Sequence, residues 1–179
     1  MREKDAPQAQ PKVDAGQTIL LNQSDWITTS QSVHHAALDL VQNAERTVFV
    51  LVSNFVQGQF DDPDVTAALS VFARSSRYAQ LCILVSSTQK ITATPHPLLQ
   101  LQHRLSSLIQ IRQVLPDQAS DLDLMLVDQR HLLTLQLARS GLTAHRIQHA
   151  IPHAQQLSER FLAWWQTAQP ILELRRLSL

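Results

Sequence analysis

The hydrophobic positions of this chain follow two alternating periodicities. Three runs of strand length are rich in aliphatic and β-branched residues, namely "TVFVLVSNF" (47–55), "AQLCILVSS" (79–87) and "IQIRQV" (109–114). The segments before and between these runs repeat apolar residues every three or four positions, which is the spacing of an amphipathic helix. Strands that alternate with helices in this way predict an α/β domain, in which helices cover the faces of a central sheet.

The helix signals are clearest in two segments. In "DDPDVTAALSVFARSSR" (61–77), Asp62 precedes Pro63 as a candidate cap, and proline at the first helical position is typical of a helix start. In "PHAQQLSERFLAWWQTAQP" (152–170), apolar residues keep helical spacing until the final proline ends the pattern. Between these segments, "DLMLVDQRHLLTLQL" (123–137) has two apolar runs around a short polar turn, which predicts an antiparallel hairpin. In its first strand, Met125 and Val127 should face one helical layer and Leu124 and Leu126 the other.

The expected architecture is a single-domain αβα sandwich with a central mixed, mainly parallel sheet. A mainly parallel sheet is expected because a helical crossover joins one strand to a parallel neighbour. We assign this domain to residues 17–179. Residues 1–16 are polar and contain Pro7, Pro11 and Gly16, which predicts a disordered N-terminal tail.

Charge and cysteine content limit the classes of partner and compartment. The 179 residues include 15 Lys and Arg against 15 Asp and Glu, so no net charge favours nucleic acid or anionic lipid. Cys82 is the single cysteine, which excludes an internal disulfide. The sequence has neither a signal-peptide pattern nor an apolar run long enough to span a bilayer. We therefore expect a cytoplasmic protein that does not insert into membranes.

Three carboxylates frame an apolar strand in "DLDLMLVDQRHLL" (121–133). Asp121 and Asp123 alternate along the predicted strand, so their side chains would lie side by side on one face and could bind a hard cation such as Mg²⁺. Solvated residues at the entrance of a strand give the same pattern, and we prefer that interpretation. Asp128 follows the strand on the opposite face by parity, and we interpret it as a turn residue that binds backbone amides.

The order of elements resembles the phospholipase D-like fold over residues 17–179. The motifs that carry the resemblance are "HRLSSLIQIRQV", "DLDLMLVDQRHLL" and the Phe-x-x-x-Trp pattern in the closing segment. More narrowly, the chain is similar to an uncharacterised bacterial group of single-copy domains related to that superfamily. Active members carry a His-x-Lys-x-x-x-x-Asp motif and then a Gly-Ser-x-Asn segment. The resemblance implies that the histidine would attack phosphorus while Lys and Asn bind the phosphoryl oxygens.

The catalytic motif is degenerate when it is aligned with this sequence. Asp121 stands at the position of the His, Asp123 at that of the Lys, and Asp128 at that of the Asp. The Gly, Ser and Asn positions of the second segment hold Leu135, Gln136 and Ala138. Only the Asp is retained, and a carboxylate at the Lys position repels a phosphodiester. We therefore expect a non-catalytic binding, regulatory or scaffold module. The alternative is a metal-assisted phosphodiesterase or nuclease that uses Asp121 and Asp123.

Histidines and arginines supply the remaining candidate sites. His145, His149 and His153 recur every four residues, but no cysteine or nearby acid completes a zinc site, so we expect no metal there. We expect no cofactor either, since the sequence has no dinucleotide fingerprint and no phosphate-binding glycine loop. An anion-binding patch could form on the third helix, the following strand and the hairpin turn, from Arg104, Arg112 and Arg130. Scattered, solvated arginines are the simpler interpretation.

The partner expected from these features is a protein or an anionic ligand of unknown identity. Nucleic acid stays open, although the net charge does not support it. Trp164 and Trp165 are adjacent on the last helix, so we expect only one of them to face inward. The outer one is a candidate interface, because exposed tryptophans are typical contact anchors. A homodimer, if the protein forms one, would be built on that tryptophan and the closing segment "ILELRRLSL" (171–179).

Overall fold

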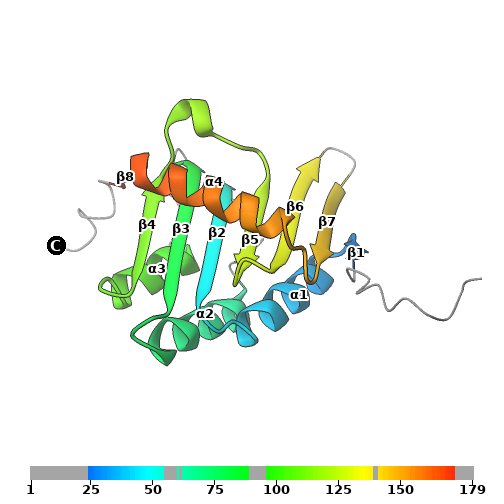
Figure 1. Cartoon of the computed structure of the whole chain (residues 1–179), viewed down its shortest axis with the longest axis horizontal. Coiled ribbons are helices and arrows are strands. Elements are labelled where there is room, and N and C mark those ends of the chain that lie inside the picture. The colour runs from blue at the N-terminus through cyan, green and yellow to red at the C-terminus, as the bar shows by residue number, and fades with distance from the viewer. Residues whose placement is uncertain (1–23, 55–59, 61, 89–95, 139–140, 172–179) are drawn as a thin grey trace, which may run out of the picture.

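Figure 1 shows the computed structural model of the chain as a sheet with helices on both faces. The structure describes residues 24–54, 60, 62–88, 96–138 and 141–171. Residues 1–23, which include the predicted tail, most of "ILELRRLSL" and three internal stretches (55–59 with 61, 89–95 and 139–140) lie outside the described residues.

One mixed sheet runs through the described part of the chain. Its eight strands follow the order β1-β7-β6-β5-β2-β3-β4-β8. The strands are β1 (Ser24–Ile27), β2 (Thr47–Asn54), β3 (Gln80–Ser87), β4 (Ile109–Gln113), β5 (Asp123–Val127), β6 (His131–Ala138), β7 (Gly141–Ile147) and β8 (Gln169–Pro170). The predicted hairpin is confirmed as β5 and β6, which pair antiparallel.

The expectation of a mainly parallel sheet is wrong. Only the pairs β2–β3 and β3–β4 are parallel, whereas the other five pairs are antiparallel. The reason lies in the connections. Helices make the crossovers from β2 to β3 and from β3 to β4. After β4 the chain passes to the free edge of β2 and continues through β5, β6 and β7, whose short turns can join only antiparallel neighbours.

The helices form two layers on opposite faces of the sheet (Figure 1). One layer contains three helices, α1 (Ser30–Gln42), α2 (Pro63–Ser75) and α3 (Pro97–Arg104). The other contains α4 (His153–Thr167), and a short 3₁₀ turn (Pro116–Gln118) lies in the connection from β4 to β5. The predicted start of α2 is confirmed, since the Asp62 side chain accepts a hydrogen bond from the Asp64 amide and Pro63 begins the helix. The αβα sandwich is confirmed.

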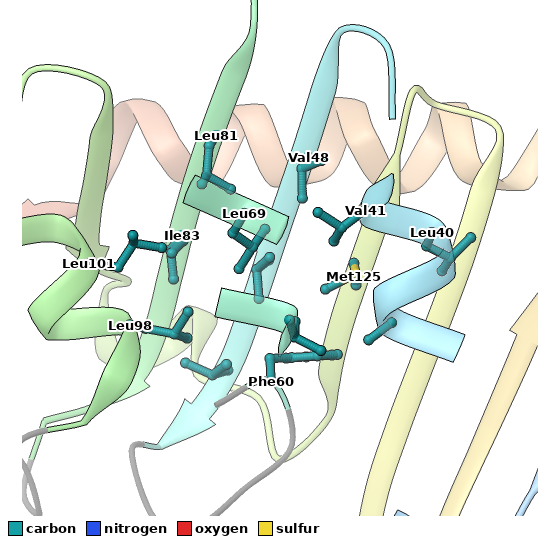
Figure 2. Close-up of a cluster of buried hydrophobic side chains, with 14 of the residues drawn as sticks. Leu40, Val41, Val48, Phe60, Leu69, Leu81, Ile83, Leu98, Leu101 and Met125 are labelled. Carbon is teal, nitrogen blue, oxygen red and sulfur yellow. The ribbon is translucent and has the colours of Figure 1, made fainter. Parts of the chain in front are cut away.

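Each face of the sheet has its own apolar core. On the side of α1 to α3, Figure 2 shows Val41, Leu69 and Leu98 of the three helices directed toward the strands. Strand β5 contributes Met125 and Val127 to this core, whereas Leu124 and Leu126 belong to the core under α4. The alternation predicted from the sequence for these four residues is therefore confirmed, and β5 is a central strand buried on both faces.

Helix α4 is held against the sheet by aromatic contacts. The rings of Phe49 on β2 and Phe161 on α4 stack with centroids 4.8 Å apart. Phe161 in turn stacks against Trp165. Aromatic side chains bury large areas, so these contacts fix the position of α4 across the middle of the sheet. No helix among the described residues is both long enough and apolar enough to span a membrane.

Candidate functional site

Asp121 and Asp123, which align with the first two positions of the catalytic motif, lie at the edge of the sheet where the parallel strands end. Strand β5 runs antiparallel to β2, with Leu51 opposite Leu124. The first residue of β5, Asp123, is therefore next to the carboxyl end of β2. In open α/β sheets, ligands bind outside the carboxyl ends of parallel strands. Asp123 and the chain ends around it consequently form the candidate site, which we call the strand-end site. It consists of Ser53, Ser86, Ser120, Asp121 and Asp123.

Asp123 is a buried hydrogen-bond acceptor. Its side chain is 7% exposed, and its carboxylate accepts the backbone amide of Ser53 at 2.6 Å. Burial raises the pKa of Asp123, because the ionised form loses hydration, while hydrogen bonds from the Ser53 amide and side chain act in the opposite direction. The carboxylate thus joins β5 to the end of β2 and faces the α1–α3 side, as Met125 and Val127 do.

Asp121 does not share a strand with Asp123. The strand begins at Asp123, and Asp121 lies exposed in the connection before it. This connection is fixed to β3, since the Ser120 amide donates to the Ser86 hydroxyl at 3.0 Å. The expected side-by-side arrangement on one strand face is therefore not formed, because the backbone turns before β5 begins. Within the described residues, no group of three or more His, Cys, Asp and Glu side chains could hold a metal ion.

Asp128 lies at the opposite end of β5 from the strand-end site. Its carboxylate accepts the backbone amides of Glu45, Arg46 and Thr47, each at 2.8 Å, and its own amide donates to the Thr47 carbonyl. We expected this side chain to bind backbone amides in a turn. It does bind amides, but they belong to the start of β2 rather than to the hairpin. The retained motif aspartate therefore connects two distant segments of the chain.

The second motif segment lies on β6, beside the first. Leu135 pairs with Asp123 across the two strands and is buried in the α1–α3 core. Gln136 is exposed, and Ala138 pairs with Gly141 where β6 turns into β7. The structure thus brings the two motif segments together as neighbouring strands, with a core leucine at the glycine position of the motif.

The three candidate arginines do not converge. Arg104 is exposed at the end of α3, on the α1–α3 side. Arg130 lies in the β5–β6 turn, and two strands, β2 and β3, separate β5 from β4 in the sheet. Arg112 lies on β4 and donates to the Trp165 carbonyl and the Gln110 side chain, both at 3.0 Å. Its guanidinium also lies 4.4 Å from the centre of the Trp165 ring, so Arg112 fixes the end of α4 to the sheet.

The histidines of the four-residue repeat also lie apart. His145 is on β7, His149 is in the turn after it, and His153 begins α4. The three histidines therefore do not share one helix face, which their four-residue spacing would give on a continuous helix. His149 has a left-handed backbone (φ +56°) and makes an edge contact with His131, whose ring centre is 5.1 Å away. Sequence spacing gave no signal for the contact with His131, which depends on how β6 and the turn meet in space.

The expectation that only one of the two adjacent tryptophans faces inward is wrong. Trp164 and Trp165 are both half-buried and pack against the α4-side core. Both can do so because adjacent helical residues are only about 100° apart and can straddle the line of contact with a broad sheet. The guanidinium of Arg160 lies over Trp164 at 4.6 Å. The most exposed tryptophan is instead Trp26 on the edge strand β1, at 71%, where it stacks on His145.

The architecture is that of the phospholipase D-like fold. NucT from Helicobacter pylori superposes with a TM-score of 0.62 at 6% identity, over 83% of this chain and 99% of NucT. Nuc from Salmonella typhimurium, a phospholipase D family member, gives 0.59 at 14% identity, over 83% of this chain and 96% of Nuc. These likenesses confirm at the level of fold the resemblance inferred from the sequence. Residues 29–177 match the family described as a domain of unknown function, DUF7931, and the chain belongs to that family.

A third similar structure comes from a larger protein. TrmBL2, described as an archaeal chromatin protein with a novel mode of DNA binding, superposes with a TM-score of 0.61 at 12% identity. The likeness covers 89% of this chain, which spans 57% of TrmBL2. No curated protein sequence matches that of this chain. The structural likenesses therefore concern the fold, and chemistry must be argued from the site.

Proposed function

We propose that this domain is a non-catalytic relative of the phospholipase D enzymes that acts as a binding, regulatory or scaffold module. The observation that carries the proposal is the state of Asp123. At the motif position of the phosphate-binding lysine stands a buried carboxylate that accepts a backbone amide and whose pKa burial raises. A group used in this way stabilises the strand ends and would repel a phosphodiester when ionised.

The other motif positions support the same conclusion. The position that aligns with the nucleophilic histidine holds Asp121 instead, which is exposed in a connection. The retained Asp128 uses its carboxylate oxygens on three backbone amides. Both aspartates that the fold holds in place are thus engaged with the main chain, and neither is directed at a substrate. We infer that the motif has been converted from a catalytic to a structural role.

We favour a protein as the partner of this module and place it in the cytoplasm. The described arginines at candidate positions are separated, and the chain has zero net charge, so the electrostatic footprint usual for nucleic acid is weak. Half-buried, unpaired Cys82 suits a reducing compartment. TrmBL2 is described as binding DNA, so DNA is the alternative ligand to test. We expect no binding of labelled duplex or single-stranded DNA at low salt by fluorescence anisotropy.

The decisive experiment is hydrolysis of bis(p-nitrophenyl) phosphate and of nucleic acid by the purified protein. It is run with EDTA, with Mg²⁺ and with Mn²⁺. We expect no turnover in any condition. Metal-dependent turnover that is lost in both Asp121→Ala and Asp123→Asn, but kept in Asp117→Ala, would instead establish the metal-assisted phosphodiesterase. Asp117 is the matched control, because it is an exposed carboxylate on the 3₁₀ turn outside the strand-end site.

A further inference from the structure

Helix α2 presents an exposed stripe with a particular order of charges. Its inner face is buried through Val65, Leu69 and Phe72. The outer face carries four exposed residues at spacings of three, four and three, a pattern that places them on one side of a helix. This outer stripe consists of Asp64, Ala67, Val71 and Arg74. In Figure 1, α2 lies between α1 and α3.

The centre of the outer stripe is apolar and open. Val71 is 62% exposed, and Ala67 is a small residue that lets another helix approach closely. Both line a groove of about 570 Å³ between α1 and α2 and a second groove of about 340 Å³ between α2 and α3. A ridge with a groove on each side is the surface against which a second helix packs in ridges-into-grooves fashion.

The ends of the outer stripe are charged and available. Asp64 lies in the first turn of α2 and Arg74 in the last. The Arg74 side chain donates its Nε hydrogen to the Ser70 carbonyl. Among the described residues, neither Asp64 nor Arg74 forms an ion pair within the chain. The stripe therefore has an unpaired anion at one end and an unpaired cation at the other.

We propose that the outer stripe of α2 is a self-association surface, in which α2 packs antiparallel against α2 of a second copy of this chain. A twofold axis between Ala67 and Val71 places Ala67 of one copy opposite Val71 of the other. The same axis places Asp64 of each copy opposite Arg74 of the other. One symmetry operation thus satisfies both the apolar centre and the two charged ends, which is the self-complementarity that an isologous interface requires.

A second copy fits this surface better than an unrelated protein does. The acid and the base are equally far from the axis, so each finds its opposite charge when the surface meets itself. A different partner would have to present the same two charges in reverse order at the same spacing. Because a single helix buries less than the ~800 Å² per partner of standard interfaces, α1 and α3 must add contacts across the grooves, and we expect a reversible dimer of micromolar affinity.

The experiment is sedimentation velocity of the full chain over a dilution series, with charge-reversal variants. Asp64→Arg places two arginines opposite each other, and Arg74→Asp places two aspartates opposite each other. We expect each to raise the dimer dissociation constant at least ~10-fold. The double variant Asp64→Arg/Arg74→Asp restores both pairs and should return the constant close to that of wild type. Glu159→Arg, an exposed reversal on α4 on the opposite face of the sheet, is the matched control and should leave it unchanged.

Circular dichroism of each variant checks the fold, since both reversals oppose the helix dipole. Val71→Gln, which changes no charge at a position open to solvent, supplies an independent test and should also weaken the dimer. A wild type that stays monomeric at every concentration would overturn the proposal. So would folded single reversals that dimerise as well as wild type, or a folded double variant that fails to recover.

Discussion

The carboxylate of Asp123 on β5 accepts the backbone amide of Ser53 on β2 at 2.6 Å, across seventy positions of sequence. In active phospholipase D enzymes, the position that aligns with Asp123 holds a phosphate-binding lysine. Here the same position closes a contact between two strands of the sheet. This edge of the sheet therefore holds a buried carboxyl group, and its contribution to protein stability can be measured.

Asp123 should make the fold less stable as pH rises. Because burial raises its pKa in the native state, the native protein keeps this proton to a higher pH than the unfolded chain does. Above the ordinary value of 3.8, the unfolded chain releases the proton first, so stability falls with rising pH up to the native pKa. Asp123→Asn has no proton to lose and should remove this fall, as measured by urea unfolding from pH 4 to 7.

The hydrogen bond of Asp123 can be separated from its charge by a second variant. Asn retains an oxygen that can accept the Ser53 amide, whereas Ala leaves that amide without its acceptor. We expect Asp123→Ala to be less stable than Asp123→Asn by about 1–3 kcal/mol, the usual cost of an unsatisfied buried donor. Equal stabilities for the two variants would show that the 2.6 Å contact contributes nothing.

Removal of the Asp128 carboxylate should destabilise the fold. The Asp128 side chain accepts three backbone amides at 2.8 Å. Asp128→Ala removes both acceptor oxygens and so all three hydrogen bonds, and since these amides are partly reached by water we expect a loss of about 2 kcal/mol. Asp128→Asn keeps one oxygen and also tolerates the left-handed backbone (φ +52°). It should lose about half as much in thermal or urea unfolding, and exposed Asp117→Ala should lose none.

Arg112 should not be replaceable by lysine. Its guanidinium stacks on the Trp165 ring and donates to the Trp165 carbonyl and to Gln110. A lysine ammonium is a point charge that reproduces neither the planar stack nor the two-directional donation. We expect Arg112→Lys to destabilise the fold by about 1–2 kcal/mol. Exposed Arg104→Lys should change little. If the two variants are equally stable, Arg112 does not fix α4 as described.

His131 should make the fold less stable in acid. Burial lowers its pKa in the native state, assisted by the nearby His149, Arg146 and Arg130 and opposed by Asp128. Below the ordinary value of 6.5, the unfolded chain binds a proton that the native protein does not, so stability falls as pH drops toward the lowered pKa.

His131→Gln should reduce that acid loss. Urea unfolding gives the free energy of unfolding at pH 5.5 and at pH 7.5. We expect the difference between these two free energies to be smaller in the variant than in wild type. His103→Gln, an exposed position on α3, is the control and should keep the wild-type difference. An unchanged difference in His131→Gln would mean that its neighbours do not oppose its protonation.

Local signals in the sequence predicted the elements of this fold better than their arrangement. The Asp62–Pro63 start of α2 and the alternation of Met125 with Leu124 follow from neighbours along the chain, and both are confirmed. The sequence contains no signal that places β5 at the free edge of β2. The sequence therefore did not predict that most strand pairs of the sheet are antiparallel.

The candidate site was predictable only in part, for a related reason. Asp121 and Asp123 were aligned with motif positions, but the hydrogen bond of Asp123 depends on the proximity of Ser53 on β2. The exposure of Asp121 depends on where β5 begins. Trp26 was not singled out, because its exposure results from the position of β1 at the edge of the sheet. Hydrophobic periodicity indicates on which face of a helix or strand a residue lies. It does not indicate which other helix or strand packs beside that face.

The hydrogen bond between Asp128 and Thr47 has a consequence for the nascent chain during translation. Strand β2 is made early and can pair with β3 soon afterwards. Its other edge stays unpaired until β5 has been made. The hydrogen bond from the Thr47 amide likewise needs Asp128, which comes 81 positions later in the sequence. At translation speeds of roughly 5–20 residues per second, that edge stays open for about 4–16 seconds. An apolar strand with an open edge is a template for aggregation, so this interval is when the protein most needs a chaperone.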